Sequence, residues 1–144
     1  MSEFSIRKEI YILAPIEKVF DALTTSDEIV KYYPLLEVVS DWKVGAEVLY
    51  MGEIEGASFT DFGNIISLER PNEYSYSYWS DNHGTIRAPE NHQTICYQLS
   101  EAANATTLVL QHYNLQSLDQ YELMNNTVWE HLLNSLRIHV ESGT

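Results

Sequence analysis

The C-terminal segment constrains the fold most, because it predicts one long amphipathic helix over residues 117–141. Ser117 and Gln120 have capping-box spacing, which is typical of a helix start, and no proline or glycine follows within the segment. At about 100° per residue, one broad face gathers the apolar side chains of Leu118, Tyr121, Met124, Val128, Trp129, Leu132, Leu136 and Val140. The opposite face carries Asn126, Glu130, Asn134, Arg137 and Glu141. A helix about twice the average length of about 11–12 residues needs a large apolar surface to lie on.

Alternating residues in the middle of the chain predict the strands that supply this surface. In "EYSYSYWS", residues 73–80, Tyr74, Tyr76 and Tyr78 alternate with Ser75 and Ser77, which indicates a strand with one aromatic face. Further strands are expected at residues 3–13, 44–51, 57–69 (one or two strands), 92–100 and 106–113, with a loop at residues 80–91.

Two short helices are expected between the first strand and the rest of the sheet. Pro15 suits a first helical turn, where its missing N–H costs nothing, and Thr25 and Glu28 have capping-box spacing for a second helix that ends before Pro34. The predicted order is therefore a strand, two short helices, about six strands and the long helix. Short turns between consecutive strands favour an antiparallel sheet, and helices gathered on one face predict the α+β class.

Composition excludes several classes of function. The length of 144 residues predicts a single domain over residues 1–144, and the net charge of 8 − 21 = −13 opposes the binding of nucleic acid. No apolar run approaches the roughly 18 residues that membrane insertion needs. The N-terminus lacks the features of a signal peptide, and Cys96 is the only cysteine, so we expect a cytoplasmic protein without an internal disulfide.

Several segments resemble one known family. They are "APIEKVFDALTTSDEIVKYYP", "WKVGAEVLYM", "GNIISLERPNEYSYSYW", "TTLVLQHY" and "NNTVWEHLLNSL", which together cover nearly the whole chain in order. In these the sequence resembles the START-like superfamily, also called SRPBCC, and within it the family of homologues of the activator of heat-shock-protein-90 ATPase. The resemblance implies a helix-grip fold, in which a curved antiparallel sheet of about six to seven strands wraps around the C-terminal helix. It also implies an internal cavity that commonly holds an apolar small molecule.

Two departures from the family limit what the resemblance implies. Tyr32 and Tyr33 stand where the family usually has tryptophans, which preserves an aromatic pair. The eukaryotic co-chaperone that names the family has a separate N-terminal domain associated with chaperone stimulation, and we expect 144 residues to leave no room for it. The family name therefore does not imply that activity here.

The candidate cavity residues follow from strand register. Charged Glu47 should face solvent, so Val48 and Tyr50 face inward, and the same alternation directs one face of each later strand inward. Asn125 lies within the apolar stripe of the helix, at the cavity mouth or at an end that reaches solvent. The expected lining comprises Val48, Tyr50, Tyr74, Tyr76, Tyr78, Tyr97, Leu110, His112, Asn125, Val128, Trp129 and Leu132. Of the three tyrosines in the 73–80 segment, Tyr76 and Tyr78 are expected in the void.

Three functions are compatible with this lining. The first is non-enzymatic binding of an apolar or aromatic small molecule, without a cofactor or metal, by a monomer or homodimer. The second is a cyclase- or hydrolase-type enzyme in which His112 exchanges protons with Tyr76 or Tyr78. The third is an interaction module with a chaperone partner, which predicts an exposed apolar patch instead of an enclosed void.

Overall fold

The chain folds into one antiparallel sheet of seven strands. The computed structural model describes residues 4–80, 83 and 85–142, so part of the expected 80–91 loop and residue 3 of the first strand lie outside the described residues. The strand order in space is β1-β7-β6-β5-β4-β3-β2, so β1 alone leaves the sequential order and pairs with β7. The strands are β1 Phe4–Ile12, β2 Glu37–Ser40, β3 Glu47–Ile54, β4 Ala57–Glu69, β5 Glu73–Ser80, β6 Gln93–Ala102 and β7 Ala105–Leu115.

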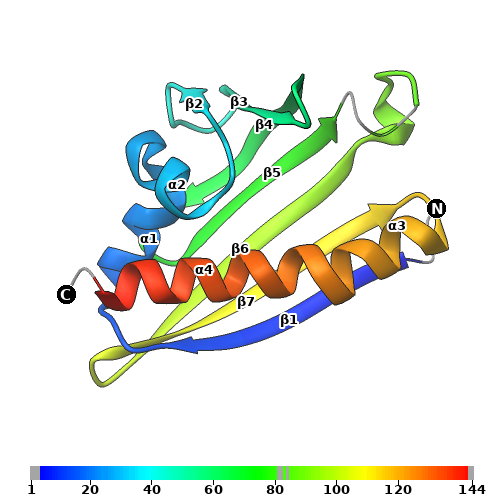
Figure 1. Ribbon diagram of the computed structural model, residues 1–144. Helices are drawn as coiled ribbons and strands as arrows, with labels where there is room; N and C mark the ends of the chain where they lie inside the picture. The colour runs from blue at the N-terminus through cyan, green and yellow to red at the C-terminus, as the bar shows by residue number, and fades with distance from the viewer. Residues whose placement is uncertain (1–3, 81–82, 84, 143–144) are drawn as a thin grey trace.

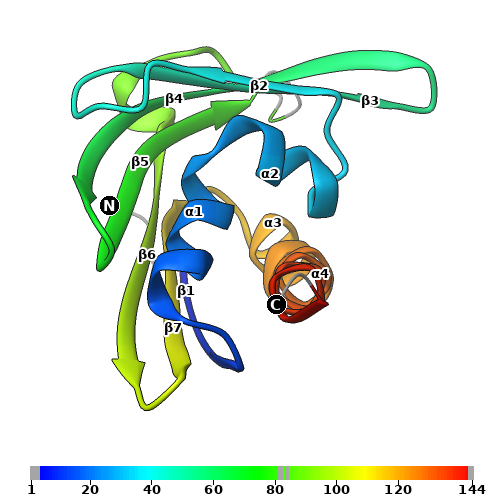
Figure 2. The ribbon, with the colours of Figure 1, turned by 90° about the vertical axis from the view of Figure 1, so that its left-hand side faces the viewer.

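The helices gather on the concave face of this sheet. They are α1 Ile16–Thr24, α2 Ser26–Tyr32, α3 Leu118–Leu123, the π-helical turn η2 Met124–Val128 and α4 Trp129–Ser142. The short 3-10 helix η1 Pro89–Asn91 lies in the connection between β5 and β6. Backbone dihedral angles stay helical through both junctions of η2, so α3, η2 and α4 form one continuous helical rod. The rod runs along the sheet in Figure 1, and Figure 2 shows the sheet curving around it with α1 and α2 beside it. This arrangement confirms the predicted helix-grip fold. No helix among the described residues is long and apolar enough to cross a membrane.

The rod begins as its sequence predicts, but it contains a turn that the sequence did not predict. The Ser117 hydroxyl accepts a hydrogen bond from the backbone N–H of Gln120 at 3.1 Å, which is the expected cap. The π-helical turn then adds one residue to the helical repeat and rotates the buried face between the two halves of the rod. Leu118, before this turn, is 55% exposed, contrary to its predicted place on the apolar face. Leu133, not predicted there, is buried because it lies one helical turn from both Trp129 and Leu136.

One strand was not expected. β2 comprises four residues, Glu37–Ser40, and pairs with β3 at the edge of the sheet. Only Val38 of this strand is buried, so the sequence has too few alternating positions to give a strand pattern. The expected one or two strands at residues 57–69 form the single long strand β4.

A pair of side chains joins α2 to the C-terminal half of the rod. The His139 ring nitrogen Nε2 lies 2.8 Å from Glu28 Oε1, and Lys31 donates to Glu28 Oε2 at 3.1 Å. The His139 ring also stacks on Tyr32, with 5.7 Å between centroids. The hydrogen bond from His139, followed by that from Lys31, lowers the pKa of Glu28.

Replacing Glu28 by glutamine should therefore change the pH dependence of stability. A folded-state pKa below the unfolded value stabilises the protein above the usual Glu pKa of 4.5, and this stability is lost as the pH falls through the folded-state pKa. Because the site is partly exposed, we expect Glu28→Gln to cost less than about 1 kcal/mol near neutral pH and progressively less in acid. Urea unfolding of the wild type and of Glu28→Gln from neutral to acidic pH measures this effect. A difference in the free energy of unfolding that does not change with pH would contradict the prediction.

Candidate functional site

A cluster of tyrosines covers the middle of the sheet's inner face. Ring centroids lie 5.1 Å apart for Tyr74 and Tyr76, 5.5 Å for Tyr50 and Tyr76, and 6.0 Å for Tyr74 and Tyr97. The hydroxyls of Tyr50 and Tyr74 form a hydrogen bond of 2.7 Å. Burial raises the pKa of Tyr50, Tyr74 and Tyr76 well above the ordinary value. These phenols therefore remain neutral, and they pack against one another as part of the core.

A buried hydrogen-bonded chain connects the rod to this inner face. The indole Nε1–H of Trp129, the first residue of α4, donates to His112 Nδ1 on β7 at 3.0 Å. The other ring nitrogen, His112 Nε2, lies 2.5 Å from the side-chain oxygen of Gln93, the first residue of β6. All three side chains are buried. These two hydrogen bonds thus fix the rotation of the imidazole and connect the rod to β6 and β7.

The hydrogen bonds to Trp129 and Gln93 leave His112 with no free nitrogen for acid–base chemistry. Burial, with a smaller contribution from His83, lowers the pKa of His112 to about 3, so the imidazole is neutral at physiological pH. The ring lies edge-on to Tyr78, with 6.0 Å between centroids, but both its nitrogens are bound to Trp129 and Gln93. A substrate would have to break one of these buried bonds to exchange a proton with His112.

A pocket of about 520 Å³, called the inner pocket below, lies between the sheet and the rod. Its lining includes residues from the end of β5 and from α3, and both of these elements can be followed in Figure 1. Its apolar wall consists of Tyr33, Pro34, Phe59, Tyr78, Leu123, Met124 and Val128. Its polar groups are Asp61, Ser80, His83, Gln116, Ser117, Asp119 and Gln120. The π-helical turn contributes Met124 and Val128, so the irregular part of the rod forms one side of the pocket.

Tyr78 and His83 form a hydrogen-bonded pair in the wall of the inner pocket. His83 Nε2 lies 3.2 Å from the Tyr78 hydroxyl, and His83 Nδ1 accepts the backbone N–H of Ser80 at 3.3 Å. Burial and then the nearby Asp61 carboxylate raise the pKa of Tyr78, so its phenol stays protonated. Within the described residues, no three His, Cys, Asp or Glu side chains gather as a metal site requires.

The structure places all but one of the twelve candidate residues in the pocket wall or in the core. Tyr78 and Val128 line the inner pocket. The buried core contains Val48, Tyr50, Tyr74, Tyr76, Tyr97, Leu110, His112, Trp129 and Leu132. Asn125 lies on the π-helical turn and donates to the Asn126 side chain at 3.0 Å, outside the pocket lining. Contact of any of these residues with a ligand stays a prediction.

Sequence reasoning missed most of the residues that line the inner pocket. One signal was present for Asp61: it shares the inward face of β4 with Gly63 and Ile65, which is an unusual place for a carboxylate. His83 had no such signal, because it lies in a loop and reaches Tyr78 only through the folded backbone. Leu123, which the sequence pattern did not assign to either face of the helix, is exposed and lines the pocket.

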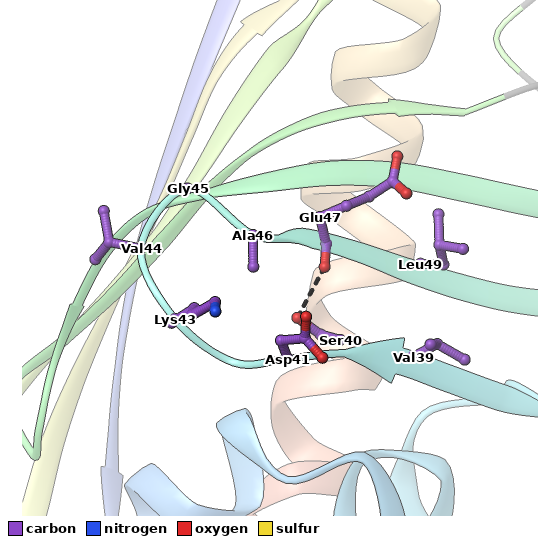
Figure 3. A pocket seen from close by; sticks show the side chains of 9 residues that line it. All are labelled: Val39, Ser40, Asp41, Lys43, Val44, Gly45, Ala46, Glu47 and Leu49. Atoms are coloured by element: carbon purple, nitrogen blue, oxygen red, sulfur yellow. Dashed lines mark hydrogen bonds between the residues drawn. The ribbon is translucent and has the colours of Figure 1, made fainter.

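A second hollow, the outer depression, lies at the connection between β2 and β3 and has a volume of about 450 Å³. In Figure 3 Val44 lies at one end and Val39 and Leu49 at the other, with Asp41, Lys43 and Glu47 between them. The Ser40 hydroxyl donates to the Glu47 carbonyl at 2.8 Å and closes the base of this loop. Val44 is 63% exposed and Val39 45% exposed, so these apolar side chains of the outer depression face solvent. The outer depression therefore serves as a comparison for the inner pocket.

Comparisons with known proteins agree with this architecture. The solution structure of protein ChR145 from Cytophaga hutchinsonii superposes with a TM-score of 0.84 and 27% identity, covering 99% of this chain and 98% of that one. The Aha1 dimer from Colwellia psychrerythraea superposes with a TM-score of 0.76 and 23% identity, covering 97% of this chain and 98% of that one. CalU16 from Micromonospora echinospora superposes with a TM-score of 0.74 and 21% identity, covering 97% of this chain and 76% of that one. No curated protein matches the sequence. The family model described as activator of Hsp90 ATPase homolog 1-like protein matches residues 13–141. The chain therefore belongs to the activator of Hsp90 ATPase homolog 1-like family.

Proposed function

We propose that this protein binds an apolar or aromatic small molecule in the inner pocket, between the sheet and the helical rod, without chemical conversion of that molecule. The observation that carries the proposal is the composition of the pocket, whose apolar wall of Tyr33, Phe59, Met124 and Val128 contains a few polar groups. Small-molecule sites typically combine apolar walls of this kind with a few polar groups that orient the ligand, in volumes of about 300–1,000 Å³.

The chemistry of the wall supports binding over catalysis. His112 is neutral and both its nitrogens are occupied, and the phenol of Tyr78 is held in its protonated form. Of the predicted His/Tyr pair, Tyr78 lines the pocket and can contact a ligand, whereas His112 does not line it, and neither group is prepared as a base. Transfer of an aromatic surface from water into this pocket contributes about 25 cal/mol per Å² buried.

Two matched valine substitutions test the location of the site. Val128→Trp fills the inner pocket, whereas Val44→Trp adds the same side chain at the outer depression. With the neutral fluorescent probe N-phenyl-1-naphthylamine, we expect saturable binding to the wild type and a loss of at least about tenfold, about 1.4 kcal/mol, in Val128→Trp. Val44→Trp should bind as the wild type does.

The comparison is informative because both variants carry the same added indole. Equal binding by both variants and the wild type would exclude the inner pocket as the site. A loss confined to Val44→Trp would place the ligand at the outer depression instead. Circular dichroism of each variant controls for folding.

A further inference from the structure

The buried chain from Trp129 to Gln93 has a fixed direction. An indole Nε1–H can only donate, so His112 Nδ1 must be the acceptor and carries no proton. The neutral imidazole then has its proton on Nε2, which donates to the Gln93 side-chain oxygen at 2.5 Å. This assignment determines the orientation of the Gln93 amide, because the oxygen must face His112 and the NH₂ group must face away from it.

The NH₂ group at the end of this chain has no acceptor. Gln93 is 1% exposed. Among the buried side-chain nitrogen and oxygen atoms of the described residues, Gln93 Nε2 is the one that has no hydrogen-bond partner. A buried donor left unpaired costs about 1–3 kcal/mol. Such a group calls for an explanation, and a partner from outside the polypeptide, such as a bound water or a ligand, is one that would satisfy it.

Gln93 is not itself among the residues that line the inner pocket, but it is paired with one of them. In the β5–β6 pairing its Cα is directly opposite that of Tyr78, and side chains at paired positions share one face of the sheet about 4.5–5.5 Å apart at Cβ. Tyr78 lines the pocket, and His112 lies on the other neighbouring strand. Since the amide oxygen is bound to His112, the NH₂ group of the same amide is left for a different partner.

The neighbouring Tyr78 hydroxyl is a donor for a similar reason. His83 Nδ1 accepts the backbone N–H of Ser80, so the proton of the imidazole is on Nε2 and is donated to the Tyr78 oxygen. The phenol's own proton is then left to donate elsewhere. Two donors, one from Tyr78 and one from Gln93, therefore come from directly paired positions of β5 and β6.

We propose that the ligand of the inner pocket carries a neutral acceptor oxygen, such as the carbonyl of an aromatic ketone or quinone, and that Gln93 Nε2–H and Tyr78 Oη–H donate to it. This inference rests on the proposed function and specifies its ligand class. A carbonyl oxygen has two lone pairs and can accept both bonds. The Asp61 carboxylate in the same wall opposes an anionic acceptor, as does the net charge of −13.

A pair of ligands of matched shape tests this specificity. 2-Acetylnaphthalene and 2-ethylnaphthalene differ by the carbonyl oxygen, so the ratio of their dissociation constants isolates the acceptor. We expect the wild type to bind the ketone at least about tenfold more tightly, and Gln93→Met to lower this preference to within about threefold. Tyr78→Phe should lower it in part. Gln98→Met is the control, because Gln98 faces outward on the same strand and donates to Glu73.

Infrared spectroscopy of the wild type gives a second test that does not depend on a variant. With a ¹³C-labelled carbonyl, the bound ketone should absorb at lower frequency than in an apolar solvent, because donated hydrogen bonds weaken the C=O bond. A carbonyl band at the apolar-solvent position would overturn the inference even if Gln93→Met did not fold.

The outcomes separate this inference from the proposed function. Equal affinity of the wild type for both naphthalenes would mean that the pocket binds ligands but that Gln93 and Tyr78 do not donate hydrogen bonds to the carbonyl oxygen. In that case this inference would be wrong and the proposed function would stand. If Gln93→Met keeps the wild-type preference for the ketone, Gln93 does not donate to the carbonyl oxygen. If neither naphthalene binds, the proposed function fails and the inference fails with it.

Discussion

Trp129→Ala is expected to destabilise the folded protein by about 3–5 kcal/mol, the range typical of removing a buried tryptophan. Trp129 is almost completely buried where the rod meets the sheet, and its ring lies edge-on to Tyr97 and His112 at 6.1 and 5.9 Å between centroids. The truncation removes this packing and also leaves His112 Nδ1 without its donor. Urea unfolding monitored by far-UV circular dichroism measures the loss.

Two further variants separate packing from hydrogen bonding at this position. Trp129→Phe retains an aromatic ring but not the N–H, so we expect an intermediate loss that includes about 1–3 kcal/mol for the unsatisfied His112 acceptor. Ile138→Ala on the same helix should change stability by less than about 0.5 kcal/mol, because Ile138 is 51% exposed. Equal effects of Trp129→Ala and Ile138→Ala would refute the described packing of the rod.

Gly63→Val should also destabilise the protein, by about 1–3 kcal/mol or more, because a side chain at this position has no space. A Cβ atom there would lie 2.7 Å from the Ser77 carbonyl oxygen, 2.9 Å from Tyr76 Cδ2 and 3.0 Å from Val48 Cγ1. The backbone oxygen cannot move without disturbing the pairing of β4 with β5. Thermal and urea unfolding should both show the loss.

Asn64→Val is the matched control for this substitution. Asn64 is the next residue of β4 and faces solvent, where a β-branched side chain suits a strand. We expect a change within about 0.5 kcal/mol. A Gly63→Val protein as stable as Asn64→Val would mean that the inner face of β4 is less closely packed than the structure shows.

Much of the fold could be predicted because it depends on local periodicity. The alternation of Tyr74, Tyr76 and Tyr78 predicts a strand with an aromatic inner face, and β5 has this form. The apolar stripe of the last segment likewise predicts the rod. The π-helical turn and β2 could not be predicted in this way, since one interrupts the helical period and the other is too short to establish a period.

The candidate site was less predictable, because it depends on how distant segments meet. Strand parity places Tyr76 and Tyr78 on the same face, but only the curvature of the sheet and the course of the rod decide that Tyr78 borders the pocket while Tyr76 is in the core. His83 and Gln93 acquire their roles from hydrogen bonds to Tyr78 and His112. No periodicity in one segment encodes such contacts between segments.

The same inner face therefore has two functions along its length. Towards α4, Tyr97 and His112 pack against Trp129 and anchor the rod. Towards α3, the rod passes through its π-helical turn, Leu118 and Leu123 are exposed, and the inner pocket opens beneath Met124 and Val128.

NMR of the methionine methyl groups tests the central claim most directly. The chain has three methionines, of which Met124 lines the inner pocket, whereas Met51 lies on β3 and is not part of the lining. On titration with 2-acetylnaphthalene, the Met124 methyl signal, assigned with Met124→Leu, should shift saturably while that of Met51 stays in place. Saturable binding that leaves the Met124 signal unchanged would contradict the account.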